Sequence, residues 1–157
     1  MNEALITNWN NTVQPNETVY HLGDVSFGKP EQTRRVLAQL NGKKVLIRGN
    51  HDTKRHMFWD DFFEEVCDYK EIRHNGQRII LCHYAFRVWN SSHHGSWHLY
   101  GHSHGSLPDD LGALSWDVGS DNNNFTPISF EQVKEIMSHK TFVPVDHHEP
   151  NRGNPDS

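Results

Sequence analysis

The apolar positions of the chain fall into short runs whose spacing switches between that of helices and that of strands. Near the N-terminus, Leu5, Trp9 and Val13 recur every four residues, which predicts a short amphipathic helix. Asn75-Gly76 lies between two apolar runs and is a strong two-residue signal for a β-hairpin. Together the runs predict strands at 18–24, 43–48, 65–74, 77–83, 97–100 and 113–118, and helices at 2–13, 30–40, 56–65 and 129–139.

The order of these elements predicts an α/β fold. Helices separate the early strands, whereas the hairpin adds an antiparallel pair, so we expect a layered sandwich of mixed β-sheets flanked by helices. The length of 157 residues suits one domain. We place this domain at residues 1–145, because residues 146–157 form a polar tail with two prolines and little to bury.

Composition narrows the class of protein. Hydrophobic residues make up 34% of the chain, the mean hydropathy is -0.79, and no apolar run approaches the roughly 20 residues that span a membrane. The segment MNEALITNWNN has neither the basic nor the apolar region of a secretory signal, and Cys67 and Cys82 are too few for a disulfide framework. We therefore expect a cytoplasmic location.

The charge of the chain bears on its partners. The net charge of -5, with no run of Lys or Arg longer than a pair, argues against extended duplex nucleic acid as a partner.

Thirteen histidines are more than packing alone requires, and their positions suggest metal binding. Four segments place Gly or a small turn with Asp, Asn or His directly after an apolar strand: HLGD at 21–24, RGNHD at 48–52, LCH at 81–83 and YGHSH at 100–104. In open α/β sheets, sites form beyond the carboxyl ends of strands. The candidate ligands are Asp24, Asn50, His83, His102 and His104, a mixed oxygen and nitrogen set that suits Mn²⁺, Fe or Zn²⁺ better than Ca²⁺.

The spacing of these ligands is compatible with two ions. His102 and His104 are two residues apart, so in an extended backbone their side chains point the same way, roughly 6–7 Å apart. Two ions about 3.5–4 Å apart could each take one of these ligands, with a carboxylate such as Asp24 between them. Glycines at 23, 49 and 101 would let the backbone turn sharply and approach the ions.

In this order, GDVSFG, GNHD, a lone His that ends an apolar strand, and GHSH resemble the motifs of the calcineurin-like metallophosphoesterases. The resemblance extends from Leu22 to about Val118. It implies a hydrolase that cleaves a phosphate monoester or diester with two divalent transition-metal ions. The substrate would be a phosphorylated small molecule or a nucleotide.

The resemblance also implies a place for each ligand. Asp24 would bridge the two metals. One site would be completed by Asn50, His83 and His102, and His104 would belong to the other.

GNHD would supply catalytic groups as well as a ligand. By the resemblance, His51 would act as an acid or as a phosphate-binding group near the leaving oxygen, with Asp52 positioning it. Two ions would activate water and take up charge on the phosphoryl oxygens, while an imidazolium protonates the leaving alkoxide. Arg48 could add a phosphate contact if its side chain faces the cleft.

The chain departs from the family pattern at its N-terminus. The family's first motif, Asp-x-His on an opening strand, supplies two ligands to the metal that His104 also binds. Residues 1–23 contain no Asp, and their only His is His21. The chain therefore looks like a member without the first strand. The alternative function is that of an N-terminally truncated, one-metal or inactive member that acts as a binding domain, whereas the scarcity of Cys argues against a purely structural zinc domain.

Two consequences of the missing strand can be stated. An apolar run at Thr141–Val145, followed by Asp146 and His148, could supply the missing strand and ligands from the other end of the chain or from a neighbouring chain. Pro144 argues against this, because proline fits poorly in a central strand. An exposed sheet edge could also favour a homodimer.

The remaining aromatic and polar residues have both a structural and a functional interpretation. The loop before GHSH either forms plain surface or lines the mouth of the substrate site; its histidines are His93, His94 and His98. Trp89 and Trp97 could stack on a nucleobase, although packing in the core or the loop is the simpler interpretation. Asp117 either orients a ligand His or caps a turn.

Overall fold

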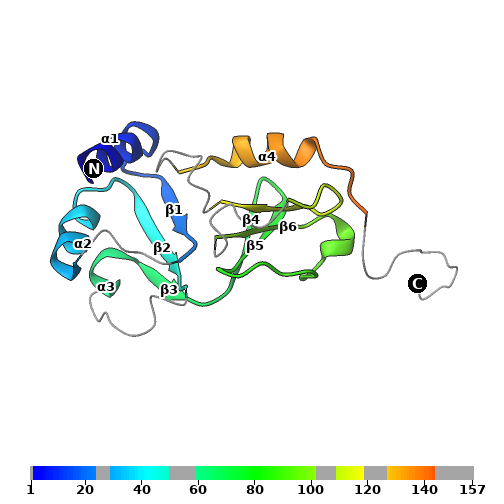
Figure 1. Cartoon of the computed structure of the whole chain (residues 1–157), viewed down its shortest axis with the longest axis horizontal. Coiled ribbons are helices and arrows are strands. Elements are labelled where there is room, and N and C mark those ends of the chain that lie inside the picture. The colour runs from blue at the N-terminus through cyan, green and yellow to red at the C-terminus, as the bar shows by residue number, and fades with distance from the viewer. Residues whose placement is uncertain (1, 24–28, 50–58, 102–108, 119–126, 144–157) are drawn as a thin grey trace, which may run out of the picture.

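The structure, a computed structural model, describes residues 2–23, 29–49, 59–101, 109–118 and 127–143, which form two β-sheets with helices packed on them (Figure 1). One sheet has three strands, β1 (Thr18–His21), β2 (Lys43–Ile47) and β3 (Glu65–Cys67). The other has four, β4 (Lys70–His74), β5 (Gln77–Leu81), β6 (Trp97–Tyr100) and β7 (Ser115–Asp117). The helices are α1 (Asn2–Thr12), α2 (Pro30–Leu37), α3 (Trp59–Phe62) and α4 (Phe130–Ser138), and a 3₁₀ turn, η1, covers Ser92–His94.

The three-stranded sheet is parallel, with β2 between β1 and β3. Its central strand KKVLI is apolar on both faces, as is typical of a parallel strand that is covered from both sides. Leu46 packs with Leu5 and Trp9 of α1 and with residues of α2. Val45 and Ile47, which alternate with Leu46, join the core on the other face.

The four-stranded sheet is mixed. β4 and β5 form the predicted antiparallel hairpin, and Asn75 and Gly76 at its turn have φ of 51° and 81°, the positive pair that a tight two-residue turn requires. β6 then pairs parallel to β5, and β7 parallel to β6. The expected mixture of parallel and antiparallel pairing is therefore confirmed.

The two sheets share one hydrophobic core. Val45 and Ile47 of the parallel sheet pack with Ile79 and Leu81 of the mixed sheet. Helix α4 covers this core through Val133 and Met137, and Figure 1 shows it lying along the mixed sheet. This arrangement is the layered α/β sandwich that the sequence predicts, and it brings the carboxyl ends of β1 and β2 close to the end of β5.

Helices α1, α2 and α4 begin where the sequence predicts, within one residue. Pro30 opens α2, and Ser129 caps α4 by accepting a hydrogen bond from Gln132 N at 3.1 Å, while Gln132 Oε1 accepts from Ser129 N at 2.8 Å. The helix predicted at 56–65 is shorter, with α3 at Trp59–Phe62, and residues 50–58 lie outside the described part of the chain. Within the described ranges, no helix is long and apolar enough to cross a bilayer.

The prediction of one continuous strand over 65–74 is wrong. β3 ends at Cys67 and pairs parallel to β2, whereas β4 begins at Lys70 and pairs antiparallel to β5. The chain leaves one sheet and enters the other at Asp68 and Tyr69. Asp68 has two partners there. Its carboxylate forms an ion pair with Arg48, and its backbone carbonyl oxygen lies 3.7 Å from Cys82 Sγ.

The chain after α4 runs along the loop before β7. Thr141 N donates to Leu111 O at 3.1 Å, and Val143 N donates to Gly112 O at 2.8 Å. The described part of the run that could have replaced the missing strand, Thr141 to Val143, is irregular, in line with the argument from Pro144. Asp146 and His148 lie outside the described residues, so their replacement of the missing motif stays a prediction.

Candidate metal and phosphate site

The carboxyl ends of β1 and β2 meet at two glycines that touch. Gly23 follows β1 with a φ of +104°, a conformation that residues with a Cβ rarely adopt. A Cβ on Gly23 would lie 2.7 Å from Gly49 N and 2.8 Å from Gly49 Cα, and it would also overlap His83 Nδ1. Glycine at position 23 is therefore required for the approach of three segments that lie far apart in the sequence.

His83 is the side chain around which these segments gather. It is only 1% exposed, and its Nδ1 lies 2.6 Å from the carbonyl oxygen of Leu22. Because a carbonyl oxygen can only accept, we assign the proton to Nδ1, which gives Nε2 the lone pair. Histidines that bind metals commonly use one nitrogen in this way, with the other held by a carbonyl or carboxylate.

The segment after β6 is tied to the same histidine. Gly101 N donates to His83 O at 3.0 Å, and β6 runs parallel to β5, the strand that leads to His83. Gly23 thus lies next to the imidazole of His83, Gly49 lies next to Gly23, and Gly101 is bonded to the backbone of His83. Each of these glycines directly precedes a predicted ligand, since Asp24, Asn50 and His102 are the next residues in the chain.

The structure describes the side chain of one of the five predicted ligands, His83. The other four, and the two residues predicted to act in catalysis, lie outside the described residues: Asp24, Asn50, His102 and His104, with His51 and Asp52. Within the described ranges, no group of three or more His, Cys, Asp or Glu residues could hold a metal ion. What the structure contributes is the meeting of the backbone segments that carry these residues.

Comparison with known proteins establishes the family. The model of the calcineurin-like phosphoesterase superfamily domain matches residues 2–120. The chain belongs to this superfamily. The uncharacterized protein MJ1445 of Methanocaldococcus jannaschii is 32% identical to this phosphoesterase domain over 144 residues, which are 87% of this chain and 75% of the relative. The crystal structure of AQ665, a protein of unknown function from Aquifex aeolicus, is similar in fold, with a TM-score of 0.64 at 23% identity over 86% of this chain and 84% of that one.

The described part of the phosphoesterase site fits the divalent metals that the superfamily generally binds. Gly23 has no Cβ between the end of β1 and the ring of His83, where a Cβ would overlap Nδ1. An imidazole with a protonated Nδ1 supplies one nitrogen donor, and the neighbouring Asp24 and Asn50 would supply oxygen donors. This donor set suits transition metals.

Arg48, which is predicted to contact phosphate, forms an ion pair with Asp68. Its Nε and Nη2 donate to Asp68 Oδ1 and Oδ2 at 2.8 and 3.1 Å, a bidentate ion pair on a partly exposed surface. A phosphate contact by Arg48 stays a prediction, and it would have to be shared with this carboxylate. Sequence reasoning missed Asp68, because nothing in the sequence marks an acid in a bend as the partner of a residue twenty positions away.

His98 does not line the mouth of a site. It lies in β6 with 0% exposure, and its Nδ1 is 3.0 Å from Ile80 O while Nε2 accepts from Phe86 N at 3.1 Å. Phe86 stacks on the ring at 4.8 Å between centroids, and Trp89 lies at 5.2 Å. Burial lowers the pKa of His98. The idea that His98 faces the substrate is therefore wrong, because the loop folds back over it.

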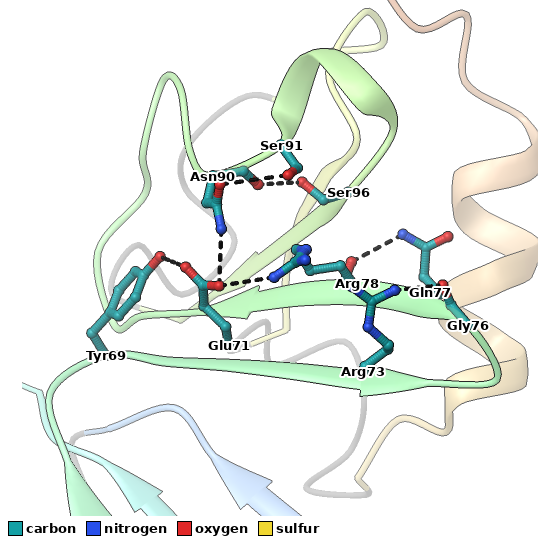
Figure 2. A network of polar contacts seen from close by, with 9 residues as sticks. All are labelled: Tyr69, Glu71, Arg73, Gly76, Gln77, Arg78, Asn90, Ser91 and Ser96. Carbon is teal, nitrogen blue, oxygen red and sulfur yellow. Dashed lines mark hydrogen bonds and ion pairs between the residues drawn. The ribbon is translucent and has the colours of Figure 1, made fainter.

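That loop is also anchored to the hairpin. Figure 2 shows Glu71 of β4 accepting hydrogen bonds from Tyr69 Oη at 2.6 Å, Asn90 Nδ2 at 3.0 Å and Arg78 Nη1 at 3.1 Å. Ser96 Oγ in turn donates to Asn90 O at 2.7 Å. The segment that follows His83 is thus a packed loop with fixed contacts.

The other aromatic and histidine residues of this region have mainly packing contacts. His93 and His94 belong to η1, with ring centroids 3.9 Å apart. Trp89 Nε1 donates to Ser96 O at 3.2 Å, and Trp97 stacks on Phe130 of α4 in the core at 5.4 Å. These contacts favour the packing interpretation of both tryptophans.

Asp117 lies in a strand and does not cap a turn. It is buried in β7 and pairs in register with Tyr100, the residue before Gly101. Burial, together with the charges of Asp117 and Asp109, raises the pKa of Tyr100 to about 12. Tyr100 therefore stays protonated beside these acids. The role of Asp117 in orienting a ligand histidine stays a prediction.

Proposed function

We propose that this phosphoesterase domain hydrolyses a phosphate monoester or diester with two divalent transition-metal ions, Mn²⁺, Fe or Zn²⁺. The observation that supports this most directly is the contact of Gly23 with Gly49 and with the ring of His83, together with the hydrogen bond from Gly101 N to His83 O. Three segments that precede predicted ligands meet there at a fourth ligand.

In this proposal each residue of the site has a separate role in the reaction. Bound cations would activate a water molecule and take up the charge that develops on the phosphoryl oxygens. The carbonyl of Leu22 keeps His83 in the tautomer that offers Nε2 as a ligand. His51 would donate a proton to the leaving oxygen, with Asp52 holding its ring, and Arg48 would bind a phosphoryl oxygen.

The proposed substrate is a phosphorylated small molecule or a nucleotide. The chain carries a net charge of -5, and its Lys and Arg form no long runs, so recognition would rest on the metal site and a few local contacts. A cytoplasmic location fits this class of substrate.

The test is metal stoichiometry combined with hydrolysis. The protein is loaded with Mn²⁺, desalted and analysed for metal per chain, and is then assayed with p-nitrophenyl phosphate and bis(p-nitrophenyl) phosphate. Near two ions per chain with turnover of either ester is the expected result. Two ions without turnover of these or of a panel of nucleotides would contradict the proposal, and one ion without turnover would favour the binding-domain alternative.

The proposed role of His51 is tested by changing the leaving group. His51→Ala should slow esters with poorly acidic alcohols more than activated aryl esters, because only the former need a proton donor, and the loss should be about 10²–10⁴-fold. The ratio of the two rates in variant and wild type is the measurement. Equal losses on both classes of ester would remove His51 from this role.

A further inference from the structure

A second buried polar centre lies around Lys140, just after helix α4. The side chain of Lys140 is only 2% exposed, and its Nζ donates to Asp109 Oδ1 at 2.7 Å and to three backbone carbonyls. These carbonyls belong to Ser115 at 2.7 Å, Ala113 at 3.0 Å and Asp110 at 3.2 Å. An ammonium group has three N–H bonds. The four acceptors use all three, and at least one N–H is shared by two acceptors.

The acceptors around Lys140 form the kind of cage that holds a cation. One carboxylate and three carbonyl oxygens are the ligands that a hard metal ion takes in proteins. Here the cage closes on an ammonium, and the ring of Trp116 lies 5.9 Å from it. A charge this deeply buried is stable only because every donor is paired, so the loop and the lysine depend on each other.

The backbone closes the same loop from the other side. Gly112 N donates to Asp110 Oδ1 at 2.9 Å, and the chain after Lys140 pairs with the loop through Thr141 N to Leu111 O. Residues 109–115 are therefore fixed to the end of α4 by side-chain and backbone bonds together.

This centre lies at one end of the segment that carries two predicted ligands. Residues 101–109 contain His102 and His104. Gly101 is held at the first end by its hydrogen bond to His83 O, and Asp109 is held at the last end by Lys140. The two anchors come from different parts of the chain, one from the loop after β5 and one from the end of α4.

We propose that Lys140 is a positioning residue for the metal site: its ammonium acts as an internal cation that fixes residues 109–115 and thereby one end of the segment bearing His102 and His104. The part of this inference that concerns metal affinity rests on the proposed function. The part that concerns the cation cage stands on the contacts of Lys140 alone.

The first experiment compares Lys140→Met with Lys134→Met. Lys134 is an exposed lysine on α4, the helix that ends just before Lys140, and is the matched control. Mn²⁺ affinity is measured by titration calorimetry at a temperature at which far-UV circular dichroism shows each variant folded. Lys140→Met should bind Mn²⁺ about 10–100-fold more weakly, as when a supporting partner of a ligand is lost. It should also melt roughly 5–10 °C lower, while Lys134→Met matches the wild type. Wild-type Mn²⁺ affinity in folded Lys140→Met would overturn the positioning role.

A second experiment tests the cage itself. In Lys140→Ala, n-propylammonium replaces the deleted atoms from Cγ to Nζ and should recover most of the lost melting temperature, whereas tetramethylammonium, which has no N–H, should not. Equal effects of both ions would overturn the internal-cation role.

If the Lys140 variants do not fold, Asp109→Asn removes only one charge of the cage. Unchanged melting temperature and Mn²⁺ affinity in Asp109→Asn would overturn the proposal. A wild type that binds no Mn²⁺ would refute the proposed function, and the amine rescue would still decide the cage.

Discussion

Two buried histidines, His83 and His98, make the same contact through Nδ1 and differ in what lies against the ring. Each places Nδ1 against a backbone carbonyl, that of Leu22 at 2.6 Å for His83 and that of Ile80 at 3.0 Å for His98. The second nitrogen of His98 accepts from Phe86 N, and aromatic rings cover its ring. The ring of His83 lies instead against Gly23, where a Cβ would overlap Nδ1.

The difference leads to the prediction that His83 binds a metal and that His98 is structural. Burial does not distinguish the two histidines, because both rings are shielded from water. The tautomer does not either, because both are assigned Nδ1–H. The surroundings of the two rings differ: Nε2 of His98 accepts from Phe86 N, whereas Gly23 lies against the Nδ1 side of His83. The ring of His83 adjoins Gly23, and its backbone carbonyl accepts from Gly101, two glycines that each precede another predicted ligand.

The largest effect is expected from His83→Ala. Loss of a ligand should weaken Mn²⁺ binding and phosphate-ester hydrolysis by more than about 100-fold, the upper end of what loss of a mere supporting partner causes. Titration calorimetry and initial rates measure the two effects. His94→Ala, in the exposed 3₁₀ turn, is the control and should change neither. A His83→Ala protein that binds Mn²⁺ like the wild type would show that His83 is as structural as His98.

The next effect tests the glycine beside His83. Gly23→Ala adds a methyl group that overlaps His83 Nδ1 and also strains a φ of +104°. It should lower the free energy of unfolding by about 1–3 kcal/mol and weaken Mn²⁺ binding. Gly76→Ala is the matched control, because its φ of +81° is strained too but no heavy atom lies within 4 Å of the added Cβ. If both variants bind Mn²⁺ like the wild type, crowding at His83 has no bearing on the metal.

A smaller effect, on stability alone, is expected from His98→Phe. The ring volume is kept, but Phe86 N loses its acceptor in the interior, which should cost about 1–3 kcal/mol. Urea unfolding measures this loss. The turnover number at a temperature well below the melting point should stay within about twofold of the wild type, since His98 contacts none of the predicted ligands among the described residues. A collapse of turnover in a stable His98→Phe protein would contradict the comparison.

The smallest effect is a pH dependence of the free energy of unfolding that His98 causes and that His98→Phe lacks. Burial lowers the pKa of His98 below its ordinary 6.5, so below that pH the unfolded chain binds more protons than the folded one. The stability from neutral His98 is therefore complete above pH 6.5 and is lost as the pH falls through the lower folded pKa. The difference in unfolding free energy between wild type and His98→Phe, measured from about pH 8 to about pH 5, should shrink toward acid. Parallel profiles would exclude this role of His98.

The sequence pattern predicts a site because the predicted ligands follow closely after apolar strands. The glycines before Asp24, Asn50 and His102 were visible in the same way, and so was the hairpin at Asn75-Gly76. These are local signals, since the residues that turn or end a strand lie next to the strand itself.

What the sequence could not show depends on contacts between distant segments. The run from 65 to 74 has strand character throughout, and nothing in it marks the point near Asp68 where its pairing partner changes from β2 to β5. His98 differs from a loop histidine only because Phe86 and Trp89 fold back over it. Lys140 resembles an ordinary basic residue at a helix end, and its acceptors come from residues some 25 to 31 positions away.

The two sheets also differ in how far apart along the chain their partners lie, and this sets an order of assembly. β4 and β5 are joined by two turn residues, whereas β1 reaches β2 only through a crossover that includes α2. Short loops close first and cost the least chain entropy, so the hairpin should form early and the parallel sheet later. The junction of Gly23, Gly49 and His83 needs both sheets in place, so it should be one of the last parts of the molecule to form.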